Sequence, residues 1–181
     1  MRRFVALPVP DEPRAALAAA VASLRERSPR WRWTDPTGWH VTCAFLGEVD
    51  DADVAPVVEV VRRAVGTGVV PLTLRFGAAG RFGDRILWAG LDDDPAGSVA
   101  ALGERVQAGL EAAGLPVDRK PVRPHLTLAR ARRAAPITSR APAAVSLPDR
   151  AWTCDRVELW ASQLDDGPAR YTVDASVPLL G

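Results

Sequence analysis

The chain contains only two histidines, and each begins the same four-residue pattern. His40-Val41-Thr42-Cys43 lies in the first half of the sequence and His125-Leu126-Thr127-Leu128 in the second, so both stretches have the pattern His-x-Thr-x. Imidazole titrates near neutral pH, so a pair of histidines suits combined general acid and general base catalysis. Threonine hydroxyls can hydrogen-bond to phosphate oxygens. The paired pattern therefore predicts one catalytic site built from both halves of the chain.

Both patterns lie in apolar, alternating stretches that predict β-strands over Trp39–Leu46 and Arg123–Arg130. On a strand, residues two positions apart share a face. Each histidine should therefore point the same way as its threonine, while the residues between them enter the core. If the two strands lie close together, two imidazoles and two hydroxyls meet in one site.

The same alternation makes two further predictions. Phe45 is an odd number of positions from His40, so it is predicted to be a core residue. Arg130 is the best candidate for an additional phosphate ligand, although regular alternation puts it on the face opposite His125. We therefore expect Arg130 to reach a phosphate only if the strand ends or bends near Ala129.

Other site chemistries have less support in the sequence. A metal centre needs three or four ligands, and no set of Asp, Glu or Cys with familiar spacing accompanies the two histidines. A serine nucleophile is not favoured either, because no Gly-x-Ser-x-Gly elbow occurs. A single His-x-Thr is most often an ordinary strand segment, but the repetition favours function. We expect no metal and no cofactor.

Composition limits the class of protein. The 181 residues carry a formal net charge of +1, with 48% hydrophobic and 25% charged residues, which is typical of a soluble globular protein and excludes a disordered chain or a wholly basic nucleic-acid binder. No apolar run approaches the roughly 18 residues of a membrane span. Cys43 and Cys154 make neither a disulfide scaffold nor a zinc site. A cytoplasmic protein with no membrane partner is expected, monomeric by default.

The average charge conceals an acid-free basic stretch around the second motif. Between residues 119 and 147 there are seven basic residues and no Asp or Glu: Arg119, Lys120, Arg123, Arg130, Arg132, Arg133 and Arg140. Part of this stretch is expected to be a solvated loop. The functional interpretation is electrostatic guidance of a phosphodiester chain toward the site.

The remaining pattern predicts an α+β fold, because helices alternate irregularly with hairpin-like strand pairs. No linker divides residues 1–181, so one domain is expected. Asp11 is expected to cap the first helix. Gly77–Asp84 and residues 131–143 are predicted loops, Thr153–Gln163 is predicted to be one strand, and Asp165-Asp166-Gly167 is predicted to be a hairpin turn.

Several stretches resemble the 2H phosphoesterase superfamily and, within it, the RNA 2',3'-cyclic phosphodiesterases, also called 2'-5' RNA ligase-like proteins. They run in family order across nearly the whole chain: Arg3–Pro8, Trp39–Val49, Ile86–Gly90, Arg123–Arg130, Glu158–Ser162 and Gly167–Tyr171. The paired His-x-Thr is the specific part. Cys43 departs from the family, which often has Leu there, but it should face away from the site.

The resemblance implies a two-lobed fold with pseudo-two-fold symmetry, in which antiparallel sheets form a central cleft and helices lie outside. It also implies metal-independent hydrolysis of a terminal ribose 2',3'-cyclic phosphate to a 2'-phosphomonoester. By analogy His125 is the proton acceptor and His40 the proton donor, while Thr42, Thr127 and Arg130 bind the phosphate. The nearly symmetric motifs do not by themselves order the two histidine roles. The reverse reaction, 2'-5' joining of RNA ends, would use the same residues.

Two alternatives remain open at this stage. The same chemistry could act on a small nucleotide such as ADP-ribose cyclic phosphate, which a closed cleft would favour, whereas a longer basic track would favour RNA 3'-ends that bear a cyclic phosphate. A third possibility is a protein that binds RNA ends without turnover, and two intact motifs argue against it.

Overall fold

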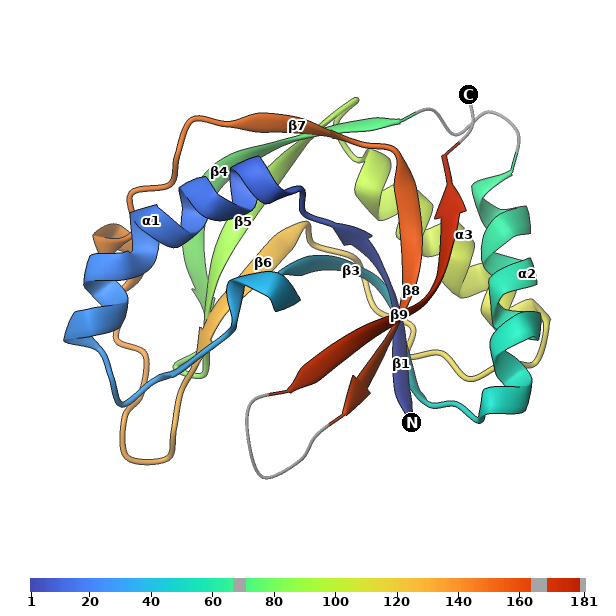
Figure 1. Cartoon of the computed structure of the whole chain (residues 1–181), viewed down its shortest axis with the longest axis horizontal. Helices are drawn as coiled ribbons and strands as arrows, with labels where there is room; N and C mark the ends of the chain where they lie inside the picture. The colour runs from blue at the N-terminus through green and yellow to red at the C-terminus, as the bar shows by residue number, and fades with distance from the viewer. Residues whose placement is uncertain (67–70, 164–168, 180–181) are drawn as a thin grey trace.

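Two antiparallel sheets make up the framework of this computed structural model, which describes residues 1–66, 71–163 and 169–179 (Figure 1). The first sheet has the strand order β3 (His40–Glu48), β1 (Arg2–Pro8), β8 (Arg156–Gln163), β9 (Arg170–Pro178). The second has the order β2 (Arg32–Trp33), β6 (His125–Arg130), β5 (Ile86–Asp94), β4 (Leu72–Phe82), β7 (Ala151–Cys154). The two motif strands, β3 and β6, belong to different sheets, and they contact each other where the two sheets meet. The α+β prediction is confirmed.

The helices cover the faces of the sheets that turn away from the histidines. Helix α3 (Ser98–Ala112) packs on β3 and on α2 (Val54–Val65), while α1 (Asp11–Arg27) lies on the side of the second sheet (Figure 1). Val41 and Leu126, which alternate with the motif residues, belong to one large hydrophobic cluster with the helix residues Leu17 and Val106. Of the helices described, none is both long and apolar enough to cross a membrane.

Strand β3 contains two residues more than β1 over their paired length, Cys43 and Leu46, and the one within the motif is Cys43. Its pairing with β1 matches Ala6 with Thr42 and then Val5 with Ala44, so Cys43 is left over as a β-bulge. The extra residue reverses the alternation beyond it. Phe45 is therefore on the same face as His40, and it is 42% exposed. The prediction that Phe45 is a core residue is wrong for this reason.

Strand β6 has the same irregularity at the corresponding position. Trp88 of β5 pairs with Thr127 and Leu87 pairs with Ala129, which leaves Leu128 as the extra residue. Leu128 and Ala129 are both fully buried, and Arg130 is then exposed on the face of Thr127. The strand therefore bends before Arg130, as the prediction for this residue required. The bulge at Leu128 corresponds to the bulge at Cys43, whereas the second bulge of β3, at Leu46, has no counterpart in the pairing of β6 with β5.

Two of the loop and strand predictions, for Gly77–Asp84 and Thr153–Gln163, are wrong. Gly77–Asp84 is mostly strand, because β4 runs to Phe82; its Gly80 allows the ring of Trp88 to lie where a Cβ would otherwise stand, 2.1 Å from Cζ2. Residues 131–143 form a loop as predicted, apart from the short 3-10 helix that begins at Pro142. The loop is anchored to the protein, since Ile137 is fully buried and its N–H donates to the carbonyl of Asp84 at 2.9 Å.

The predicted strand Thr153–Gln163 is two strands. β7 and β8 are separated by Asp155 and enter different sheets, so this stretch passes the chain from the second sheet back to the first. The expected cap of α1 is also wrong: Pro10 is the N-cap residue, and Asp11 is the first helical residue, paired with Arg14. The predicted hairpin turn at residues 165–167 lies outside the described residues.

Helix α3 approaches the first bulge closely at a glycine. A Cβ at Gly103 would lie 2.4 Å from Cγ2 of Val122 and 3.0 Å from the carbonyl oxygen of Cys43. At Gly109, on the same helix, the nearest heavy atom to such a Cβ is a Val60 methyl at 3.1 Å.

We therefore expect Gly103→Ala to lower the free energy of unfolding by about 1–3 kcal/mol through overpacking against the bulge. Gly109→Ala is the matched control and should be neutral or gain up to about 1 kcal/mol from helix propensity. Urea unfolding followed by circular dichroism measures both. Equal stability of the two variants would contradict close packing between α3 and β3.

Candidate active site

His40 is fixed by a carbonyl on one side and by aromatic rings around it. Its Nδ1 lies 2.8 Å from the carbonyl oxygen of Gly38, and because a carbonyl only accepts, Nδ1 carries the proton. The ring centroid is 4.5 Å from that of Phe4, 5.2 Å from that of Trp160 and 5.5 Å from that of Tyr171. The remaining ring nitrogen, Nε2, is left to interact with a ligand.

His125 is oriented in the same way in the second sheet. Its Nδ1 lies 2.6 Å from the carbonyl oxygen of Arg123, again two residues earlier in the chain. Phe82 contacts the ring edge-on at 5.0 Å between centroids, and Trp88 lies at 6.2 Å. Both imidazoles therefore have the tautomer in which Nε2 can take up a proton.

Burial and neighbouring positive charge favour the neutral form of both imidazoles. Desolvation, with smaller contributions from the nearby His125 and Arg130, lowers the pKa of His40 to about 4, although the hydrogen bond to the Gly38 carbonyl acts in the opposite direction. Desolvation also lowers the pKa of His125, with Arg130 acting in the same direction. At pH 7 the ligand-free site thus contains two neutral histidines beside one arginine, and an entering anion would favour their protonation.

The structure brings together the residues predicted for the site. Thr42 and Thr127 lie on the faces of their histidines, and within residues 1–66, 71–163 and 169–179 their hydroxyls make no hydrogen bond. Arg130 lowers the pKa of both histidines, so its guanidinium lies near each of them. Five side chains from two sheets can therefore surround one small anion.

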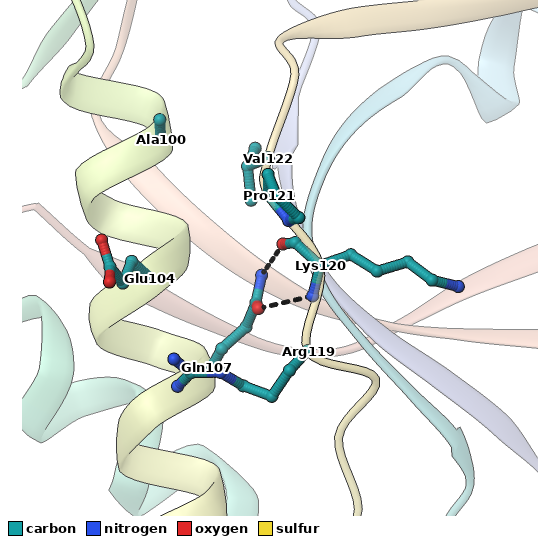
Figure 2. A pocket seen from close by; sticks show the side chains of 7 residues that line it. All are labelled: Ala100, Glu104, Gln107, Arg119, Lys120, Pro121 and Val122. Atoms are coloured by element: carbon teal, nitrogen blue, oxygen red, sulfur yellow. Dashed lines mark hydrogen bonds between the residues drawn. The ribbon is translucent and has the colours of Figure 1, made fainter. Parts of the chain in front are cut away.

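A buried glutamine ties the two motif regions to one helix. The side-chain amide of Gln107 on α3 donates to the carbonyl of Cys43 at 2.9 Å. It also donates to the carbonyl of Lys120 at 3.0 Å, and its oxygen accepts from the Lys120 N–H at 3.1 Å (Figure 2). Cys43 is the first bulge residue, and Lys120 belongs to the segment that leads into β6. Gln107 thus fixes the spacing between the bulge and this segment.

Beside Gln107 is an open pocket of about 360 Å³ between α3 and residues 119–122 (Figure 2). Its charged lining consists of Glu104, Arg119 and Lys120, and it contains neither histidine. In the described part of the chain, no three His, Cys, Asp or Glu side chains are grouped as metal ligands.

Comparison with known proteins shows which family the chain belongs to. The sequence matches the profile of the 2'-5' RNA ligase superfamily over residues 9–166, which includes both motifs. The chain belongs to the 2'-5' RNA ligase superfamily. The resemblance drawn from the paired His-x-Thr is therefore confirmed.

Relatives in this superfamily align along most of the chain. An RNA 2',3'-cyclic phosphodiesterase of Thermus thermophilus is 30% identical over 100% of this chain and 91% of its own length. A protein of the same name from Geobacillus stearothermophilus is 29% identical over 98% of this chain, which spans only 57% of that relative. A crystal structure of a Thermus thermophilus protein superposes with a TM-score of 0.83 at 29% identity, covering 100% of this chain and 99% of the other.

Several residues that surround the histidines of this 2'-5' RNA ligase superfamily member were not predicted from the sequence. Trp160 and Tyr171 lie in stretches that carried the resemblance, but no periodicity assigned them to the site. Glu158 accepts from the indole N–H of Trp160 at 2.9 Å and from Arg156 at 2.8 Å, which fixes the ring beside His40. Only knowledge of the sheet order places these residues together.

Arg32 was missed for a different reason. It stands in a two-residue strand, where no alternation can assign a face. The positive charges of Arg32 and Arg130 both oppose the burial that raises the pKa of Tyr171, so both arginines lie near this ring. By contrast, Trp39 is buried in the hydrophobic core, and Trp31 and Trp33 pack against it.

The electrostatic account predicts a specific change in titration. Removing the positive charge in Arg130→Ala should raise the pKa of both His40 and His125, because less repulsion opposes protonation. Histidine NMR chemical shifts recorded against pH measure both values, with Arg105→Ala, on the exposed side of α3, as the control. A pKa near 6.5 for His40 in the unmutated protein, or no response to Arg130→Ala, would contradict this geometry.

Proposed function

We propose that this chain hydrolyses the terminal 2',3'-cyclic phosphate of RNA to a 2'-phosphomonoester by a two-histidine acid–base mechanism. The supporting observation is that both imidazoles donate from Nδ1 to a carbonyl two residues earlier and leave Nε2 for the substrate, beside one shared arginine. The relatives named RNA 2',3'-cyclic phosphodiesterase support the choice of substrate.

In the proposed reaction His125 is the proton acceptor and His40 the proton donor. Nε2 of His125 takes a proton from water as the water oxygen forms a bond to phosphorus. The bond from phosphorus to the 3'-oxygen breaks, and Nε2 of His40 gives its proton to that oxygen. The products are a 3'-hydroxyl and a 2'-phosphomonoester, with the charge of the two histidines exchanged between them.

The low pKa of His40 means that this histidine can act as the proton donor only if substrate binding raises its pKa. His40 must be protonated to act as the donor, and a pKa of about 4 leaves it neutral at pH 7. The negative charge of the cyclic phosphate raises the pKa on binding, because it favours the charged imidazolium. Binding of substrate and uptake of the catalytic proton are therefore coupled.

Thr42, Thr127 and Arg130 are proposed to bind the phosphate. The hydroxyls can donate to its non-bridging oxygens, and the guanidinium can donate in a bidentate manner. As charge accumulates on these oxygens in the transition state, donors already in place stabilise it more than the ground state. We infer that these side chains supply the positive charge and donors of the reaction, which then requires no metal and no cofactor.

We also infer a second activity, the domain organisation, the location and the oligomeric state of the enzyme. The same groups act when a 5'-hydroxyl replaces water as the nucleophile: its oxygen bonds to phosphorus, the bond to the 3'-oxygen breaks, and a 2'-5' linkage forms, so 2'-5' ligation is inferred as a second activity. We infer one catalytic domain over residues 1–181, since residues of both sheets share one hydrophobic cluster. Free, buried Cys43 and Cys154 fit a reducing cytoplasm, and a monomer is inferred as the working unit.

The deciding experiment incubates the purified protein, in excess EDTA, with an oligoribonucleotide that ends in a 2',3'-cyclic phosphate. We expect turnover to a 2'-phosphate, and His40→Ala or His125→Ala should each lower kcat by about 10²–10⁴. Chromatography of the nucleoside monophosphates, after digestion, distinguishes 2'- from 3'-products. Loss of turnover in EDTA, or full activity of either variant, rules out the two-histidine mechanism.

A further inference from the structure

Two arginines stand directly opposite each other at the end of the second sheet. Arg32 of β2 and Arg130 of β6 are register partners, and both are exposed. The next pair along, Trp33 and Ala129, packs into the core. Because neighbours on a strand alternate, Arg32 and Arg130 share the opposite face, which is that of His125 and Thr127.

Such a pair is unfavourable unless something compensates it. Like charges directly opposite on neighbouring strands repel and destabilise the sheet. Nine of the other arginines, fewer than half of those in the chain, have carboxylate partners: Arg2, Arg3, Arg14, Arg62, Arg63, Arg75, Arg119, Arg150 and Arg156. Within residues 1–66, 71–163 and 169–179, Arg32 and Arg130 have none. The natural partner of the pair is an anion from solution.

The position of the two arginines indicates which anion they would bind. Both arginines lie near Tyr171, whose ring contacts His40, and Arg130 also lies near His125. The pair therefore adjoins the proposed place of the cyclic phosphate. Beyond it, on the side away from the histidines, the exposed Arg85, Arg132 and Arg133 follow, with the Ala131 N–H donating to the carbonyl of Arg85 at 2.7 Å.

We propose that Arg32 and Arg130 together bind a second phosphate, the phosphodiester that joins the terminal nucleotide of the substrate to the one before it. This rests on the proposed function, since it extends the same site. Two planar guanidiniums can each donate a pair of hydrogen bonds to one phosphate, and the bound phosphate removes the repulsion between them. Arg130 then serves both phosphates, while Arg32 serves only the second.

The consequence is a preference for RNA ends over single nucleotides. A cyclic mononucleotide with a free 5'-hydroxyl has no phosphate for Arg32, whereas a dinucleotide ending in a cyclic phosphate has one. Arg32 is thus a specificity-determining residue, and it distinguishes an RNA end from a small cyclic nucleotide by charge.

The test compares kcat/KM for these two substrates in the unmutated protein, Arg32→Ala, Arg32→Lys and Arg105→Ala. In Arg32→Ala we expect the ratio of dinucleotide to mononucleotide to fall about tenfold, through KM, because one charge-assisted phosphate contact is lost. Arg32→Lys should restore only part of the ratio, because it keeps the charge but cannot donate the pair of hydrogen bonds. Arg105→Ala, which removes an exposed arginine of α3, should leave the ratio unchanged.

An unchanged ratio in Arg32→Ala overturns the proposal, whether the activity on both substrates stays the same or falls equally. If the unmutated protein cleaves neither substrate, the proposed hydrolysis has failed, and binding then decides this inference separately. Calorimetry with a dinucleotide that ends in a 3'-phosphate and with a nucleoside 3'-phosphate gives the two Kd values. Arg32→Ala should lower the preference for the dinucleotide about tenfold, and an unchanged preference overturns the proposal.

Discussion

The site depends on one extra residue in each motif strand. Without the bulges at Cys43 and Leu128, strict alternation would turn Phe45 and Arg130 toward the core, where an arginine would be a buried charge without a partner. With the bulges, the fifth residue after each histidine joins its face. The core remains closed because the residues around each bulge, such as Ala44 and Ala129, are small and buried.

The two half-sites are alike in backbone and different in chemistry. Each histidine donates to the carbonyl two residues before it, and each strand bulges three residues after it. At the equivalent position beyond the bulge, however, one strand has Phe45 and the other Arg130. The aromatic rings around His40 exclude water and lower its pKa, whereas the arginine lies beside both imidazoles and prepares the site for an anion. A symmetric framework thus produces an asymmetric site.

Some residues of the candidate site could be predicted from the sequence alone, and others could not. Two His-x-Thr patterns on alternating strands were enough to predict the histidines and threonines of the site, because period two is a local property. Arg130 was predicted only conditionally, since a bulge depends on the register with a neighbouring strand that the sequence does not specify. Arg32, Trp160 and Tyr171 come from separate segments that meet only through the sheet order. The Gly-rich stretch of β4 resembled a loop because Gly80 makes room for the Trp88 ring and Gly77 for the Asp92 side chain, rather than turning the chain.

A crystal structure with a nucleoside 2'-monophosphate, the proposed product, tests the central claim most directly. The account predicts that the phosphate contacts Nε2 of His40 and of His125 together with both threonine hydroxyls, and that the Arg130 guanidinium lies on the same side of β6. A phosphate bound elsewhere, or an Arg130 side chain turned to the core face of β6, would contradict it.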